Sequence, residues 1–118
     1  LEWYEFVDHP GHYRIAFDDD GDDDFVDPAT AEDLNTNETV LIDGIPDVDD
    51  VHNYSIVVDL PDLTCENCTL QIVQVMTDKP PYGDGNDLYY HCIDVQLVEG
   101  GGPDMLEEGC GCALPGWR

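Results

Sequence analysis

The sequence contains very few basic residues. Only three Lys and Arg stand against 28 Asp and Glu, so the formal net charge is −25 at pH 7. Nucleic acids and anionic membrane surfaces are bound chiefly through Lys and Arg, and this composition therefore excludes both as partners. Metal cations, neutral polymers such as polysaccharides, and other protein chains are the partners to expect. Adaptation to high salt is a second interpretation of the same charge.

Long apolar runs are also missing. No apolar segment approaches the roughly 20 residues that cross a bilayer, and the chain does not open on a signal peptide. We therefore expect no insertion into a membrane. The hydrophobic content of 42% is ordinary for a globular protein, and a length of 118 residues suits a single domain.

The apolar residues that are present recur with a period of two, which is typical of half-buried β-strands. This pattern predicts an all-β fold: an antiparallel immunoglobulin/fibronectin-III-like β-sandwich over residues 1–99, with a long acidic loop, and a Gly-rich C-terminal tail over residues 100–118. A turn is expected at Asp43–Pro46, and only Pro28–Leu34 has a helix-like pattern. One strand carries apolar residues on both faces, Thr69–Thr77, so we expect it to be central in its sheet. The predicted strands are Trp3–Val7, His12–Phe17, Thr39–Ile42, Tyr54–Leu60, Thr69–Thr77 and Leu88–Val98.

Five cysteines in so short a chain indicate an oxidising compartment, and hence a secreted or cell-surface protein. One pair forms a CxxC motif, but the other pair is spaced more tightly than a zinc finger requires, so disulfides are favoured over zinc. We predict a bridge from Cys92 to either Cys65 or Cys68. The odd count leaves one thiol free or bonded to another segment or chain. The disulfide candidates are Cys65, Cys68, Cys92, Cys110 and Cys112.

Residues 18–27 pack seven carboxylates around one glycine, Gly21. Oxygen ligands at alternate positions, with a glycine that permits a sharp turn, are what Ca²⁺ requires. The match to an EF-hand is partial, because Ala16 occupies the first ligand position and the bidentate Glu is missing. A solvated acidic loop without an ion is the alternative. The predicted calcium ligands are Asp18, Asp20, Asp22 and Asp24.

Three segments match the N-glycosylation acceptor pattern, at Asn37, Asn53 and Asn67. The pattern is short, and Asn67 lies between two cysteines, which is an awkward place for a glycan. We retain all three as glycosylation candidates.

Three motifs occur in an order that suggests a family: His9-Pro10-Gly11-His12-Tyr13, then Cys65-x-x-Cys68-x-Leu70-Gln71, then Tyr89 three residues before Cys92-x-Asp94. Over roughly Trp3 to Val98 this order resembles the lytic polysaccharide monooxygenases and their chitin-binding type-4-like relatives. It is most similar to a group of secreted bacterial polysaccharide monooxygenase-like proteins. The resemblance implies a copper cofactor, with His9 as a ligand and Tyr89 near the axial position.

The same resemblance implies a histidine brace, in which an N-terminal histidine binds copper through its ring and its α-amino group. This chain begins at Leu1, within what corresponds to the family's strand before His9. We therefore expect the leading strand or strands, and the brace histidine, to lie outside it. A catalytic copper site needs its complete set of ligands, so the chain as given is predicted to be non-catalytic.

These features predict a secreted, extracellular β-sandwich module that acts as a surface or filament-type structural subunit. It would assemble with copies of itself or with neighbouring chains through exposed sheet edges, and its acidic loop would be stabilised by calcium. The alternative is a copper-dependent polysaccharide monooxygenase-like or polysaccharide-binding protein. In that case surface aromatic residues could stack on sugar rings, the candidates being Trp3, Tyr4, Tyr82 and Trp117.

Overall fold

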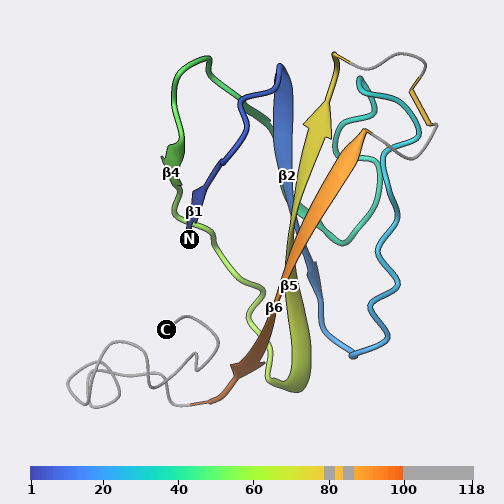
Figure 1. The fold of residues 1–118 in the computed structure, drawn as a ribbon. Helices are drawn as coiled ribbons and strands as arrows, with labels where there is room; N and C mark the ends of the chain where they lie inside the picture. Colours follow the sequence, from blue (N-terminus) through green and yellow to red (C-terminus); the bar gives the residue numbers. More distant parts are fainter. Residues whose placement is uncertain (79–81, 84–86, 100–118) are drawn as a thin grey trace.

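The computed structural model describes residues 1–78, 82–83 and 87–99, and these form an antiparallel all-β sandwich without a helix (Figure 1). The expected fold class is confirmed. The tail over residues 100–118, with Cys110, Cys112 and Trp117, lies outside the described residues. The six strands are β1 (Glu2–Tyr4), β2 (Gly11–Asp18), β3 (Val40–Pro46), β4 (Asn53–Ser55), β5 (Cys65–Met76) and β6 (Leu88–Leu97).

The larger sheet has the strand order β3-β2-β5-β6, and every neighbouring pair is antiparallel. β5 lies between β2 and β6, so the expectation of a central strand at Thr69–Thr77 is confirmed. Its side chains alternate between two covered faces, which explains why apolar residues occur on both. The register places Ile72 opposite Ile15 on β2, and Leu70 opposite Ile93 on β6.

The second layer covers one face of this sheet. β1 and β4 form a two-stranded sheet, and the extended segment after β4 continues across the same face with alternate residues half-buried. Trp3 on β1 stacks on Tyr54 of β4, with ring centroids 5.3 Å apart, and meets Tyr13 edge-on at 5.1 Å. The buried core between the layers consists of Tyr13, Ile15, Phe17, Cys68, Leu70, Ile72 and Val95.

The long acidic loop over residues 19–39 lies along the opposite face of the larger sheet, away from β1 and β4 (Figure 1). Arg14 on β2 anchors it by donating to the carbonyl oxygens of Val26 and Asp33. Thr69 on β5 adds a hydrogen bond to Asp23. Because the loop and the small sheet cover opposite faces, six consecutive residues of β2 are buried.

The one segment with a helix-like pattern, Pro28–Leu34, forms turns and no helix. The Asp33 carboxylate accepts the backbone N–H of Ala29, which closes a local turn of the kind that competes with helix formation. The Asp33 carbonyl accepts from Arg14, so tertiary contacts fix the turn in place.

Two other boundaries differ from expectation. The strands predicted over Trp3–Val7 and Tyr54–Leu60 are too long and start one residue too late, because β1 and β4 pair only with one another and have three residues each. The turn expected at Asp43–Pro46 lies inside β3, where the register against β2 shifts between Tyr13 and Ile15. Gly44 has φ +66°, a value that suits glycine, so the feature is a β-bulge.

The expected bridge from Cys92 to Cys65 or Cys68 is also wrong. Cys65 and Cys68 form a disulfide with each other, and Cys92 is a free, exposed thiol. Cys92 pairs in register with Gln71, whereas Cys68 pairs with Val95. Side chains alternate between the two faces of a sheet, so Cys92 and Cys68 lie on opposite faces and cannot meet.

Candidate functional site

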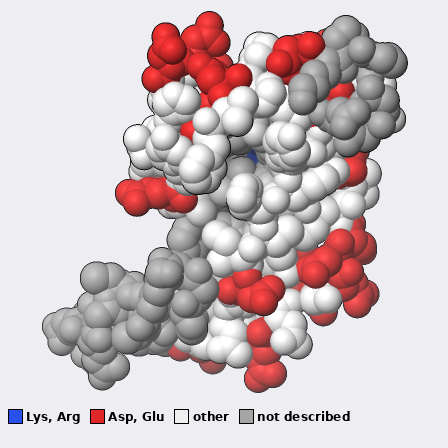
Figure 2. Space-filling view, viewed as in Figure 1, with Lys and Arg blue, Asp and Glu red and all other residues white. Residues whose placement is uncertain are grey.

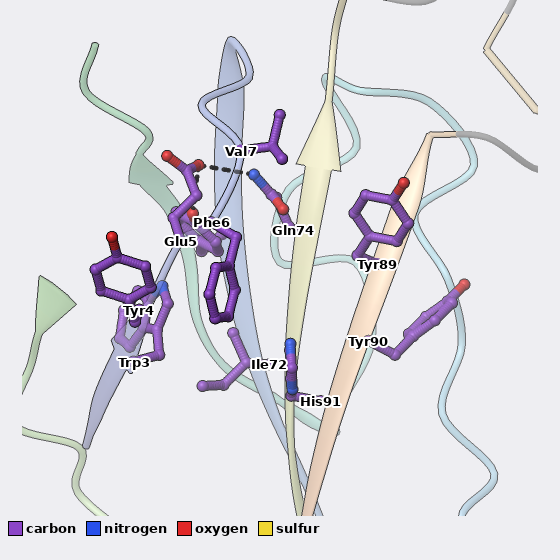
Figure 3. A pocket seen from close by; sticks show the side chains of 11 residues that line it. Trp3, Tyr4, Glu5, Phe6, Val7, Ile72, Gln74, Tyr89, Tyr90 and His91 are labelled. Atoms are coloured by element: carbon purple, nitrogen blue, oxygen red, sulfur yellow. Dashed lines mark hydrogen bonds between the residues drawn. The ribbon is translucent and has the colours of Figure 1, made fainter. Parts of the chain in front are cut away.

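A groove of about 340 Å³ opens where the two layers of the sandwich diverge. β1 and the residues after it form one wall, and β5 and β6 form the other (Figure 3). Tyr89 and His91 pair in register with Gln74 and Ile72, so they stand on the face of β6 that is directed toward the second layer. β1 and β4 do not cover them, and they remain exposed. The groove is therefore an uncovered continuation of the core.

Exposed aromatic rings stand on both walls of the groove. Phe6 is 87% exposed and packs edge-on against Tyr4, with ring centroids 5.0 Å apart. Tyr89 on the opposite wall is 54% exposed. Tyr90 borders the groove, but its hydroxyl donates to Asp27 of the acidic loop on the other face of the sheet. In Figure 2, Asp and Glu side chains lie mainly toward the periphery of the viewed face, and most of its centre is formed by other residues. Exposed apolar clusters of this kind with a polar rim are typical of binding sites.

Polar groups are placed at one end of the groove. Gln74 on β5 donates through Nε2 to Glu5 Oε2 at 2.8 Å and to Asp47 Oδ2 at 3.1 Å (Figure 3). The Tyr13 hydroxyl also donates to Glu5 Oε2, at 2.8 Å. Burial is the largest cause that raises the pKa of the Tyr13 hydroxyl, and the Glu5 carboxylate raises it further, so this hydroxyl stays protonated as a donor. Apolar walls with a few fixed polar groups are the usual composition of a ligand site.

The sequence had suggested four aromatic residues for sugar stacking, and the structure separates them. Tyr4 lines the groove and is exposed, whereas Trp3 is half-buried against Tyr13 and Tyr54. Tyr82 is half-buried, and its hydroxyl donates to the carbonyl oxygen of Pro28, which holds the acidic loop. Trp117 lies outside the described residues.

The predicted calcium ligands are only partly brought together. Asp18, Asp19 and Asp20 can each direct an oxygen to a common point, since these atoms lie within 4.8 Å of one another. Asp22 and Asp24 do not belong to this group. The Asp18 Oδ2 atom accepts the backbone N–H of Gly21 at 3.0 Å and that of Asp23 at 3.1 Å, so local hydrogen bonds already satisfy it.

The pKa values in this loop differ between neighbouring carboxyls. Burial opposes ionisation of Asp18, but the backbone N–H groups of Asp23 and Gly21 outweigh it and lower the Asp18 pKa. The Asp22 backbone N–H lowers the Asp20 pKa, but the adjacent Asp18 carboxylate outweighs it, and the net shift is upward. Calcium at this loop stays a prediction.

The two residues expected near copper, His9 and Tyr89, do not line a common site. The His9 Nδ1 atom is 3.0 Å from Asp78 Oδ2, and His9 does not line the groove that contains Tyr89. Among the described residues, the two groups with metal-binding geometry consist of carboxylates alone. Copper favours imidazole nitrogens, so the described residues do not fit a copper centre. The copper prediction therefore depends on a ligand outside them and stays untested.

The glycosylation candidates differ in exposure. Asn53 and Asn67 are exposed on β4 and β5, whereas Asn37 is half-buried and accepts the backbone N–H of Thr39 through its side chain. Glycosylation stays a prediction at all three.

No family model matches the chain, and no curated protein and no solved structure was found to be similar to it. The resemblance to the polysaccharide monooxygenases therefore stays a prediction based on three motifs. The described part of the chain contains no helix that is long and apolar enough to span a bilayer.

Sequence reasoning missed Phe6, Gln74 and His91 as site residues. Phe6 follows Tyr4 at a spacing of two, and that pattern predicts a shared strand face rather than a groove wall. Gln74 is the one polar member of a set of apolar residues at alternate positions in β5. A polar residue within such an alternating set was the available signal for a polar site in the core.

Proposed function

We propose that this chain is a non-catalytic, extracellular binding module that takes a neutral polysaccharide into the aromatic groove. The observation that supports it best is the pair of exposed rings, Phe6 and Tyr89, on opposite walls. The C–H faces of a pyranose ring are apolar and stack on aromatic rings, while its hydroxyls need fixed hydrogen-bonding partners. Gln74 and His91 provide such partners in the same groove.

The net charge supports the choice of a neutral ligand. At −25 the protein repels anionic polymers over roughly a Debye length, about 8 Å at physiological salt. A neutral glycan experiences no such repulsion. The Cys65–Cys68 disulfide supports the extracellular location, since disulfides persist in oxidising compartments.

The test is binding to a panel of neutral polysaccharides, namely cellulose, chitin, xylan and mannan, with soluble hexasaccharides for titration calorimetry. Phe6→Ala and Tyr89→Ala should each weaken binding about tenfold, or about 1.4 kcal/mol. Val57→Ala is the matched control, because Val57 is also 87% exposed and does not line the groove. Absence of binding to the whole panel, or equal binding by all three variants, would overturn the proposal.

Assembly through a sheet edge is the second candidate. β6 is the last strand in its sheet and runs for ten residues, and Tyr89–Cys92 on it are exposed. A long uncovered edge can pair with a strand from another chain. Light scattering over a concentration series should then detect dimers or larger species, and they should persist in Cys92→Ser, which removes any disulfide link through that thiol. A monomer at every concentration would contradict this function.

A further inference from the structure

A second cluster of carboxylates lies at the polar end of the core, and sequence reasoning did not identify it. Glu5 follows β1, Asp8 precedes β2, and Asp47 follows β3. Each can direct one oxygen to a common point, because these three atoms lie within 4.8 Å of one another. Glu5 is only 4% exposed, and Asp8 and Asp47 are half-buried. Two connections, the one between β1 and β2 and the one after β3, thus bring like charges together inside the fold.

The hydrogen bonds to this cluster come from neutral groups. Glu5 Oε2 accepts from Tyr13 and Gln74, and the Asp47 carboxylate accepts from Gln74 and from the Tyr54 hydroxyl at 3.0 Å. Asp8 Oδ2 accepts the backbone N–H of Asp50 at 2.7 Å. None of these donors offsets the negative charge.

Cations are scarce around the cluster. Arg14 is the one Lys or Arg among the described residues, and it is bound to Asp43. The imidazole of His52 lies beside the cluster, with its Nδ1 atom 4.0 Å from Glu5 Oε1 and 2.8 Å from the backbone carbonyl oxygen of Glu5. The described part of the chain therefore offers this cluster no fixed positive charge.

Two carboxylate oxygens of the cluster, Glu5 Oε1 and Asp8 Oδ1, are buried and accept no hydrogen bond. A buried oxygen of an ionised carboxylate without a partner is costly, and native proteins satisfy nearly all such atoms. The acidic loop differs here, because its buried member, Asp18, accepts two backbone amides. The unsatisfied oxygens at Glu5 and Asp8 point to a ligand that the chain itself does not provide.

We propose that Glu5, Asp8 and Asp47 bind one Ca²⁺ ion. Ca²⁺ takes six to eight oxygen ligands, so water and backbone carbonyl oxygens would complete a shell begun by the three carboxylates. Zinc favours nitrogen and sulfur ligands, and the three residues contain neither. Burial raises the pKa of Glu5 and the nearby Asp47 carboxylate raises it further, which agrees with a site that lacks its counter-ion.

The ion would join the segment between β1 and β2 to the segment after β3. Phe6 and Val7 lie between Glu5 and Asp8 and belong to the groove wall. Bound Ca²⁺ would therefore hold this wall against the rest of the sandwich. The cation site stands on its own residues and does not depend on what the groove binds.

The test uses the full chain, freed of metal with a chelator and studied in about 0.15 M NaCl to screen non-specific association. Calorimetric titration with CaCl₂ should give one ion per chain, and Ca²⁺ should raise the melting temperature by mass action. Glu5→Gln and Asp8→Asn should each weaken binding at least about tenfold. Asp19→Asn and Asp20→Asn, in the exposed loop cluster, are the matched controls and should bind as the parent does.

Glu5→Gln has a second signature that a purely structural carboxylate would not produce. It removes a buried charge and keeps a similar shape, so in chelator it should melt above the parent, and added Ca²⁺ should no longer raise its melting temperature. Three results would overturn the proposal: no effect of Ca²⁺ on the melting temperature of the parent, loss of binding in the loop variants alone, or tighter binding of Zn²⁺ than of Ca²⁺.

Discussion

Arg14 offers the sharpest test of how the acidic loop is held, and the change to make is Arg14→Met. The Arg14 side chain is 2% exposed and forms an ion pair with Asp43, whose side chain is fully buried; the Nε and NH2 atoms both lie 2.9 Å from Asp43 Oδ2. The same guanidinium donates to the carbonyl oxygens of Val26 and Asp33. Methionine retains much of the buried volume but removes every donor.

The expected loss follows from what remains after the substitution. Removing one partner of a buried ion pair typically costs about 3–5 kcal/mol, because the other charge stays buried. Asp43 keeps the backbone N–H groups of Asn35 and Gly44, which reduces the loss. The carbonyl oxygens of Val26 and Asp33 also lose their donor, and each adds about 1 kcal/mol to the loss unless water replaces the hydrogen bond. We expect a destabilisation of about 4 kcal/mol in total.

Urea denaturation is the suitable assay, because guanidinium chloride would itself screen the charges of so acidic a protein. With an m value of about 1.5 kcal/mol/M, the midpoint should fall by about 2–3 M. The double variant Arg14→Met/Asp43→Asn is the control, and it should recover part of the loss because it no longer contains a buried unpaired charge. The loss should persist in high salt, since a buried pair is screened little.

A loss below about 1 kcal/mol in Arg14→Met would refute the reasoning, because that is the range of an exposed ion pair. Failure of the double variant to recover stability would refute the part assigned to Asp43.

Two further predictions concern β2. Gly11→Ala should lower stability by at least about 2 kcal/mol in urea melts, because the new Cβ would lie 1.9 Å from the carbonyl oxygen of Val75; an unchanged midpoint would contradict this packing. The pKa of His12 is lowered, chiefly by burial, although the Asp43 carboxylate opposes this. The unfolded chain therefore takes up this proton more readily, so the stability that neutral His12 contributes is present above about pH 6.5 and is lost as pH falls below it. His12→Gln should lose less stability than the parent between pH 7 and 5, and parallel curves would exclude a contribution from this ring, which is faced by Asp43, Arg14 and Glu32.

The strands could be predicted from the sequence because the alternation of apolar and polar residues is a local property of the chain. Ile15 and Phe17 on β2, and Leu70 and Ile72 on β5, alternate in the sequence and share the buried core. β1 and β4 were predicted too long, because pairing depends on what lies beside a strand, and a single sequence does not contain that information. The helix-like pattern at Pro28–Leu34 is misleading for the same reason, since the Arg14 contact with Asp33 helps to fix its turns.

The sites were harder to predict. The acidic loop was predicted as a cation site because its carboxylates are adjacent in the chain. Adjacent carboxylates can, however, accept hydrogen bonds from the backbone N–H groups of their own loop, as Asp18 does. Glu5, Asp8 and Asp47 are separated by up to 42 residues and have no common motif. They are close together because β1 and β3 end, and β2 begins, at the same end of the sandwich.

The sequence by itself determined the all-β class, the central position of β5 and the overall negative charge, because these depend on composition and on a period of two. Only the tertiary structure decided which cysteines pair, where the groove opens and which carboxylates meet. Cys65 pairs with Cys68 across an irregularity in β5, where the register against β6 shifts between them, whereas the alternation of side chains places Cys92 on the other face of the sheet from Cys68. Composition and periodicity act between neighbours along the chain, whereas a site is formed by residues that only folding brings within a few ångströms of one another.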